Sequence, residues 1–171
     1  MTGISQMLTV SWMQDAVNTY GWLWPVVEMF HYAGVSLVVG MIGALDLRIL
    51  GLFRSIPIGA LRPFVPLALA GFVANLLGGA VFVTGSPTGA EFYVENLSFQ
   101  LKILALLIAF ANLMYFQLSG LEKRVYEVPA GADAPASAKI VAVVSLVAWV
   151  SVIVFGRLLM YNDTLLEFLG L

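Results

Sequence analysis

Four stretches of this chain are each apolar over the ~20 residues that an α-helix needs to cross the hydrocarbon core of a bilayer. They run from about residue 24 to 45, 64 to 84, 99 to 118 and 140 to 161. None of them alternates apolar and polar residues as the strands of a membrane barrel do. The sequence therefore predicts an all-α fold, a bundle of four transmembrane helices that forms a single membrane domain over residues 1–171.

Composition agrees with a membrane location. Hydrophobic residues make up 61% of the 171 residues and charged residues 11%, and a soluble domain of this size could not bury so much apolar surface. The net charge of −2 gives no indication of a nucleic-acid partner. The chain has no cysteine, which excludes disulfides, thiolate metal sites and cysteine nucleophiles. It also lacks a G-x-S-x-G motif and a phosphate-binding loop, so we do not expect a hydrolytic enzyme.

The basic residues of the links predict the orientation. The links after the first and third spans carry six of them: Arg48, Arg54, Arg62, Lys123, Arg124 and Lys139. The N-terminal segment, the link at 85–98 and the tail after Tyr161 carry none. The positive-inside rule places the two basic links in the cytoplasm and both termini on the outer side.

The segments that flank the spans also carry patterns. Residues 4–19 hold Ile4, Met7, Leu8 and Trp12 at helical spacing, which predicts an interfacial helix on the outer surface. The apolar tail at 165–169 is expected to lie on the surface in the same way. Residues 128–138 are rich in Pro, Ala and Gly and predict a flexible cytoplasmic loop.

Small residues recur at four-residue spacing in the first two spans. The second span offers Ala70, Ala74 and Gly78, beside Gly71 and Gly79, and the first offers Ser36, Gly40 and Ala44. Such stripes let helix backbones approach closely in lipid. They indicate packing within the chain or contact in a homo-oligomer, and the pattern does not choose between the two.

Ionisable side chains within a membrane are costly, so each one is a functional candidate. Glu28 and His31 lie three residues apart in the outer half of the first span and share a helix face. Lys102 begins the third span from the outer side, and Arg157 ends the fourth span there. With Asn75 of the second span, every span contributes a polar group to the outer half. The sequence therefore predicts a polar binding site made by Glu28, His31, Asn75, Lys102 and Arg157.

With Glu28 ionised, Lys102 and Arg157 leave one positive charge in excess, which favours an anion or a ligand with carboxylates. A neutral imidazole can hold a metal or carry a proton. In a redox version of the site, His31 binds the iron of a b-type haem whose propionates lie near Lys102 and Arg157. A second axial ligand would then come from Met29, Met41 or His31 of a second subunit.

Other interpretations stay open. Lys102 and Arg157 can reach the lipid headgroups, Glu28 can pair with Arg157, and His31 can be a hydrogen-bonded core residue. The Glu28–His31 spacing also resembles half of a di-iron site, but the chain lacks the second motif and the further acids that such a site needs.

The functional alternatives follow from these readings. One is an oligomeric transporter or channel, in which Glu28 and His31 form a proton- or anion-linked path. Another is an accessory subunit of a membrane-protein partner. Asp46 and Arg48, at the inner end of the first span, are interpreted as an interfacial anchor and turn.

Several segments carry a resemblance to a known family: residues 28–34 (Glu-Met-Phe-His-Tyr-Ala-Gly), residues 46–51 (Asp-Leu-Arg-Ile-Leu-Gly), Arg62-Pro63, and residues 99–102. Over residues 20 to 118 the chain resembles a family of small uncharacterised bacterial integral membrane proteins, a domain of unknown function. The resemblance implies four helices and the bacterial inner membrane, so that the outer side would be the periplasm. The chain is more distantly similar to the membrane domains of copper-resistance proteins and di-haem cytochromes b. Those domains carry several histidines on several helices, whereas His31 is the one histidine here.

Overall fold

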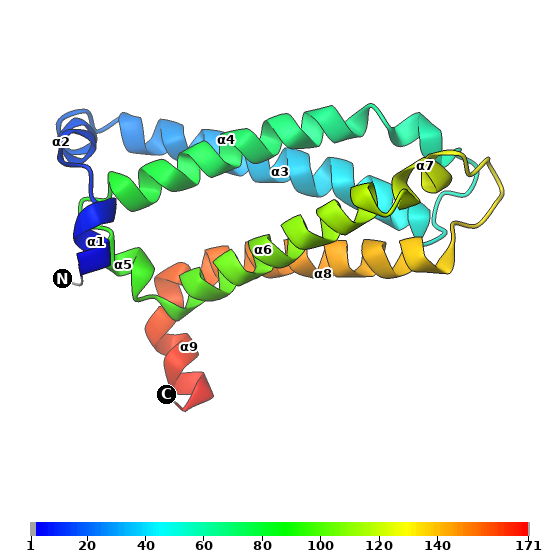
Figure 1. The fold of residues 1–171 in the computed structure, drawn as a ribbon. Coiled ribbons are helices and arrows are strands. Elements are labelled where there is room, and N and C mark those ends of the chain that lie inside the picture. Colours follow the sequence, from blue (N-terminus) through cyan, green and yellow to red (C-terminus); the bar gives the residue numbers. More distant parts are fainter. Residues whose placement is uncertain (1–2, 171) are drawn as a thin grey trace.

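The computed structural model describes residues 3–170, and none of these lies in a strand. Four long helices dominate it: α3 (Leu23–Ile49), α4 (Phe64–Thr84), α6 (Leu97–Leu118) and α8 (Ala136–Leu158). All four are long and apolar enough to cross a membrane (Figure 1). The predicted all-α, four-transmembrane-helix bundle is confirmed. The predicted spans coincide with these helices, although α3 extends to Ile49 and α8 already begins at Ala136.

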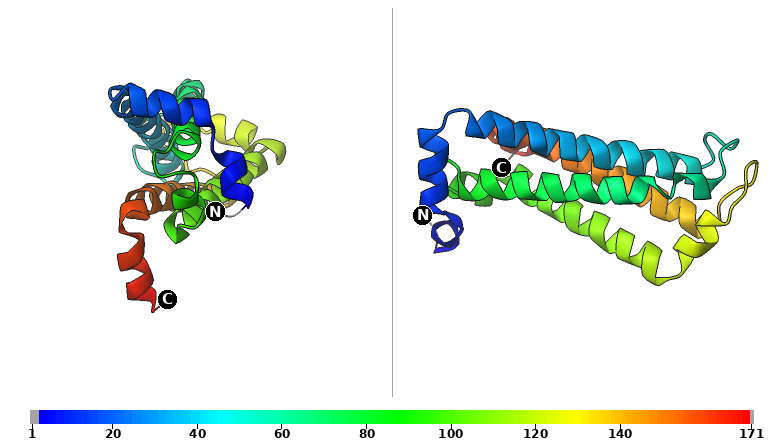
Figure 2. Two further views of the ribbon diagram at one scale, coloured as in Figure 1. Left: turned by 90° about the vertical axis from the view of Figure 1, so that its left-hand side faces the viewer. Right: turned by 90° about the horizontal axis from the view of Figure 1, so that it is seen from above.

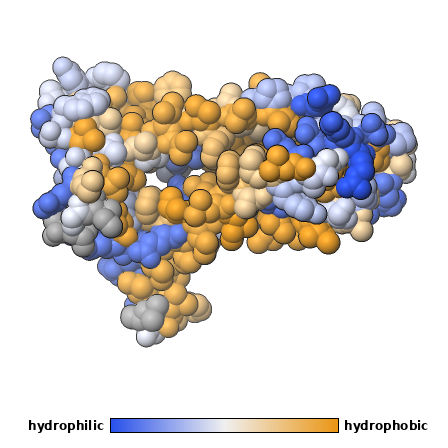
Figure 3. Space-filling model, viewed as in Figure 1, coloured by the Kyte–Doolittle hydropathy of each residue, from blue (hydrophilic) through white to orange (hydrophobic). Residues whose placement is uncertain are grey.

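The long helices form two antiparallel pairs, α3 with α4 and α6 with α8, and α3 also packs against α8 (Figure 1). Both termini lie at one end of the bundle, which we call the termini end. The opposite end, the loop end, carries η1 (Ile58–Leu61) and α7 (Leu121–Tyr126). The six basic residues of the two links belong to the loop end. The pairs diverge toward the termini end, where the space-filling view in Figure 3 shows an open gap between them.

Short helices cover part of the termini end (Figure 2). They are α1 (Gly3–Leu8), α2 (Ser11–Thr19) and α5 (Glu91–Val94); η2 (Leu159–Tyr161) continues α8, and α9 (Asn162–Leu169) projects away from the bundle. Two helices therefore occupy the segment for which one interfacial helix over 4–19 was predicted. The helix is interrupted at Thr9 and Val10. The Thr9 Oγ1 donates to the Ser5 carbonyl at 2.9 Å, and the Val10 amide donates to the Thr84 carbonyl at 3.0 Å. Met7 and Trp12 are exposed, and the side chain of Ile4 lies outside the described part.

Glycines bring α3 and α4 together. A Cβ added at Gly34 would lie 2.5 Å from the Gly71 carbonyl oxygen, and one at Gly78 would lie 2.9 Å from the His31 Cβ. The backbones thus touch along Gly34, Gly71 and Gly78, which is the close approach that small residues permit. Ser36, Gly40 and Ala70 of the predicted stripes instead face outward and are exposed. Packing within the chain therefore uses the glycines of one helix face and leaves the first-span stripe uncovered.

The buried core lies at the loop end. It is an apolar cluster made by residues of α3, α6, α8 and the links: Leu45, Ile49, Ile58, Phe116, Leu121, Val125, Ala134, Ala138, Val141 and Ala142. Val65 of α4 packs against it. The flexible loop was predicted over residues 128–138, but residues 136–138 belong to α8, and residues 128–135 are held to the first link by two backbone hydrogen bonds. Ile58 N–H donates to the Val128 carbonyl at 3.2 Å, and Gly131 N–H donates to the Arg54 carbonyl at 2.7 Å.

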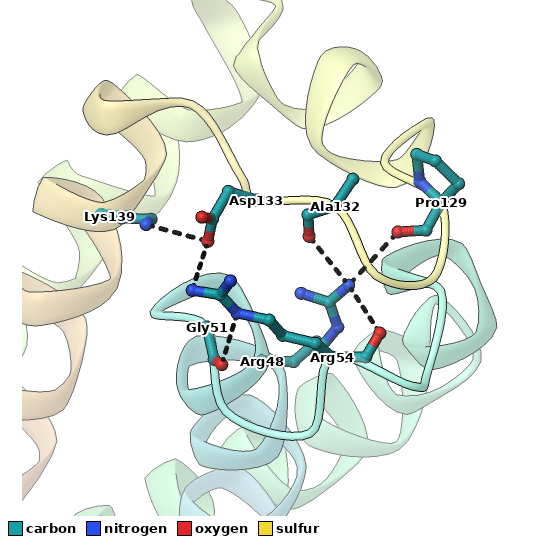
Figure 4. Close-up of polar contacts among 7 residues, drawn as sticks. All are labelled: Arg48, Gly51, Arg54, Pro129, Ala132, Asp133 and Lys139. Atoms are coloured by element: carbon teal, nitrogen blue, oxygen red, sulfur yellow. Dashed lines mark hydrogen bonds and ion pairs between the residues drawn. The ribbon is translucent and has the colours of Figure 1, made fainter.

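Two arginines complete this connection between the links (Figure 4). Arg48 is 1% exposed, and its guanidinium donates to the carbonyls of Ile56, Arg54, Pro129 and Ala132. Arg54 pairs with Asp133 at 3.0 Å, and the same carboxylate oxygen accepts from Lys139 Nζ at 3.1 Å. The loop end is therefore packed and cross-linked, while the termini end is open.

Candidate functional site

His31 is buried on the face of α3 that meets α4, and Asn75 holds it there. The His31 Nδ1 lies 2.8 Å from the Asn75 carbonyl oxygen, and the Asn75 side-chain amide donates to the His31 carbonyl at 3.0 Å. Because a carbonyl only accepts, Nδ1 carries the proton of this bond, which leaves Nε2 as the nitrogen that can take a ligand or a further proton. Asn75 is therefore a positioning residue for the imidazole.

Aromatic rings and glycines form the walls around the imidazole. The ring centroid of Phe82 lies 5.0 Å from that of His31, and the Tyr32 ring meets it edge-on at 5.9 Å. Trp24 packs on the other side of Phe82, also at 5.0 Å. The backbone of Gly78 and Gly79 on α4 also lies against the imidazole, and a larger residue at Gly78 would meet the His31 Cβ. This sequence of small residues makes the space that the imidazole fills.

Lys102 reaches the same region from α6. Asn96 starts this helix as its N-cap: the side-chain oxygen accepts from Phe99 N–H at 3.2 Å, and the side-chain amide donates to the Leu159 carbonyl at 2.9 Å. One and a half turns later, the Lys102 ammonium lies against α8, 3.7 Å from where a Cβ at Gly156 would stand. It is close enough to His31 to act on it electrostatically.

No carboxylate within residues 3–170 pairs with this ammonium. Lys102 is partly buried, and a partly buried cation without a counter-charge is an attractive site for an anion.

Glu28 bonds to Trp24 and, among the described residues, not to Arg157, the partner that the sequence suggested. Its Oε1 accepts a hydrogen bond from Trp24 Nε1 at 3.1 Å, and no ion pair joins it to Arg157 in the described residues. Its charge instead acts on the hydroxyl of Tyr93, a buried residue of α5. Burial raises the pKa of Tyr93 to about 12, and the negative charge of Glu28 contributes to the same direction.

Tyr93 is a member of this site that sequence reasoning missed. Nothing in its local sequence shows that α5 folds back over the bundle.

Arg157 lies apart from these groups. Its side chain is exposed, and its guanidinium stands 5.6 Å from the centre of the Tyr161 ring. Of the five residues predicted to form the site, the structure thus joins His31 to Asn75 and brings Lys102 close, keeps Glu28 one turn away on the same helix, and turns Arg157 outward.

A second axial ligand for a haem is not available beside His31. Met29 is 63% exposed and lies ~200° around α3 from His31. Met41 is ten residues further on, ~15 Å along the helix axis. Among the described residues, no three His, Asp or Glu side chains gather as metal ligands. One chain thus offers a single imidazole ligand.

Asp46 is a second buried ionisable group, and we had interpreted it only as an anchor. It is 5% exposed, and it lines a cavity between the four long helices. Arg48 points the other way, into the links. The sequence did not show that both side chains are buried.

Comparison of the chain with protein-family models, with curated proteins and with solved structures finds no match. The chemistry of the site therefore has to be inferred from its own residues. The termini end offers an oriented imidazole, an unpaired ammonium and a carboxylate on the next turn, which together can hold an anionic group and accept or donate a proton.

Proposed function

We propose that this protein binds a ligand or cofactor through an anionic group, at the termini end of the bundle. Lys102 provides the counter-charge, and His31 provides a hydrogen bond or a metal ligand through Nε2. Glu28 lies on the neighbouring turn of α3, and Tyr93 of α5 lies near Glu28. The observation that carries the proposal is the unpaired Lys102 ammonium beside an imidazole whose other nitrogen is held by Asn75.

The location that goes with this function is a multi-pass position in the bacterial inner membrane, with the termini end facing the periplasm. The distribution of basic residues supports the orientation, since all six link residues belong to the loop end. The resemblance of residues 20–118 to small bacterial membrane proteins supports the membrane. The exposed Ser36–Gly40 face leaves a surface for a homo-oligomer or a membrane-protein partner.

The redox version of the proposal has a b-type haem on His31, with a propionate on Lys102. Since one chain offers a single imidazole, the iron would be five-coordinate or would take its sixth ligand from another subunit. Arg157 would contribute nothing to this version, because its guanidinium faces Tyr161.

A second candidate is a transporter with a proton-linked path, and Asp46 favours it. Asp46 and His31 both lie on the bundle side of α3, fifteen residues or ~22 Å apart, so that each half of the bundle holds one group able to carry a proton. If flux into liposomes is the same for wild type and Glu28→Gln, the Glu28 relay in this path is refuted.

The binding proposal is tested with laurate, a single-chain carboxylate, titrated calorimetrically into the purified full chain. Lys102→Met keeps the length of the side chain and removes its charge. We expect it to weaken laurate binding about 10- to 100-fold, the value of a charge-assisted hydrogen bond.

Arg157→Met is the matched control, because it removes an exposed charge at the same end of the bundle. We expect its effect on laurate affinity to stay within about 3-fold. Equal losses in the two variants, or no loss in Lys102→Met, would refute the anion site. A visible absorption band that His31→Ala removes would establish the haem version, and a colourless wild type would exclude it.

A further inference from the structure

A cavity of about 190 Å³ lies between the four long helices in the half nearer the loop end. Most of its lining is apolar and comes from every long helix, with Val38 on α3, Phe72 on α4, Leu106 on α6 and Trp149 on α8. It is separate from the termini-end site, because His31 lies two turns before Val38 on α3, toward the termini end.

Asp46 forms the polar part of the wall. The only polar neighbour that acts on its carboxyl is the hydroxyl of Ser145, and no basic side chain of the described chain does. Its Oδ2 is fully buried and has no hydrogen-bond partner within residues 3–170. A buried carboxyl oxygen left without a partner costs free energy, which a ligand with a donor would recover.

Asn112, another polar residue of the wall, also presents an acceptor. Asn112 uses its side-chain amide to donate to the Val141 carbonyl at 3.0 Å, which leaves its Oδ1 as the free end. A primary ammonium has three donors and no acceptor, so it matches the side-chain oxygens of Asp46 and Asn112. The wall also carries the donors of Gln117, Tyr126 and Trp149, but no Lys, Arg or His of the described chain lines it, so an anion would find no counter-charge there.

The size of the cavity indicates the apolar part of the ligand. An apolar cavity of ~150 Å³ in another protein binds benzene, and one water occupies ~30 Å³ of liquid. A volume of about 190 Å³ therefore accepts a benzene-sized group together with one small polar group.

Access is from the side. Leu69 on α4 and Phe110 on α6 line the cavity and are 60% and 56% exposed, and α4 and α6 do not pack against each other in the described chain. In a membrane this side faces the acyl chains, so a lipophilic ligand would arrive through the bilayer.

We propose that this cavity binds a lipophilic primary amine with an apolar part the size of a benzene ring, whose ammonium is held by Asp46. The ion pair is made in a low-dielectric place, where charge-assisted hydrogen bonds are strong. The amine enters between α4 and α6.

The test is a calorimetric titration of the full chain in nanodiscs of zwitterionic lipid, with protein-free nanodiscs as the blank. Benzylamine is the probe, and benzyl alcohol is its neutral counterpart of the same shape. Wild type binds benzylamine about 10- to 100-fold more tightly than benzyl alcohol, and Asp46→Asn removes this preference.

Three further variants make the result specific. Glu122→Gln removes the other carboxylate of the cavity wall and leaves the preference for the amine intact. Ala109→Phe fills the cavity and abolishes the binding of both compounds. Lys102→Met, at the termini-end site, leaves benzylamine binding unchanged, which separates this inference from the proposed function.

Equal affinities for amine and alcohol in wild type would overturn the proposal, because they would show an apolar pocket only. A loss of preference in Glu122→Gln but not in Asp46→Asn would overturn it as well. If Asp46→Asn does not fold, the wild-type comparison and Ala109→Phe decide: a preference that Ala109→Phe does not remove contradicts this site.

Discussion

At the scale of residues, the chain's one histidine is held by two reciprocal hydrogen bonds with Asn75, each between a side chain and a backbone carbonyl. This arrangement satisfies two polar side chains within the bilayer, where an unpaired polar group would be costly. It also sets the direction of the imidazole, and so decides which nitrogen is available for function.

Replacement of Asn75 tests the strength of this pair. Asn75→Ala removes the bond to the His31 carbonyl, and we expect it to lower the free energy of unfolding by about 0.6 kcal/mol and at most about 1.7 kcal/mol, the range for interhelical hydrogen bonds in membranes. Denaturation of the purified protein in mixed micelles measures the change. Asn18→Ala, at an exposed position of α2, is the control, and an equal effect of both variants would contradict the role given to Asn75.

Sequence predicted the depth of the polar residues but not their partners. Helical rise alone places Glu28, His31 and Lys102 in one half of the bundle. The partner of His31 could not be predicted, because the bond uses the backbone carbonyl of Asn75 rather than a side chain. The outward direction of Arg157 could not be predicted either, because a side chain near a helix end can point into the bundle or away from it.

At the scale of elements, the close approach of α3 and α4 is the feature that positions the site. The glycines at 34, 71 and 78 remove the side chains that would otherwise separate these helices. Only this approach lets the His31 ring lie on the α4 backbone and reach the Asn75 carbonyl.

Two glycines of α3 give a matched test of this packing. A Cβ at Gly34 would lie 2.5 Å from the Gly71 carbonyl oxygen, whereas a Cβ at Gly40 meets nothing within 4 Å. We expect Gly34→Ala to destabilise the protein by about 1–3 kcal/mol, the usual cost of overpacking. Gly40→Ala should be neutral or stabilise it by about 0.5–1 kcal/mol, because alanine favours the helix. Thermal unfolding of both variants checks this, and similar melting temperatures would show that the helices are further apart.

Sequence indicated that the first two spans would use small residues, but four-residue spacing did not show which small residues of α3 meet α4. Ser36 and Gly40 form a regular stripe and are exposed, whereas the real contact uses Gly34. The reason is physical: spacing reports which residues share a face, and it carries no information about what that face meets.

At the scale of the whole molecule, the two ends of the bundle differ. The loop end holds the apolar core. It also holds the arginine contacts that join the two links, which Figure 4 shows. The termini end is wider, and its helices are held mainly by the α3–α4 contact and by Asn96. This division places ligand access where packing is least dense, and keeps the bundle together at the opposite end.

The ion pairs of the loop end are expected to respond to pH. The hydrogen bond from Lys139, followed by the charge of Arg54, lowers the pKa of Asp133 from its ordinary value of 3.8. A lowered carboxyl pKa contributes stability above the ordinary value, and this contribution is lost as the pH falls through the lowered one. Asp133→Asn should therefore lower the melting temperature slightly at pH 7 and have a smaller effect at about pH 3.

Melting curves of wild type and Asp133→Asn at the two pH values measure this difference. Asp163→Asn, an exposed carboxylate of α9, is the control and should leave the melting temperature unchanged at both. A difference for Asp133→Asn that persists at low pH would contradict the ionic origin of the contact.

The overall architecture was the most predictable part, because spans follow from apolar length alone. The connection of the loop end was not, since a segment of Pro, Ala and Gly such as 128–135 reads as flexible without knowledge of its partner. That partner is Arg48, which contacts two carbonyls of this segment from the end of a distant helix.

The central claim is that His31 and Lys102 form one binding site, and the single histidine allows a direct measurement. A protein labelled with ¹⁵N only at histidine, in zwitterionic lipid, gives the nitrogen spectrum of His31 alone. We predict a protonated, hydrogen-bonded Nδ1, and an Nε2 resonance that shifts when laurate is added to wild type but not to Lys102→Met. An Nδ1 without a proton, or an Nε2 resonance that laurate leaves unmoved in the folded wild-type protein, would contradict the account.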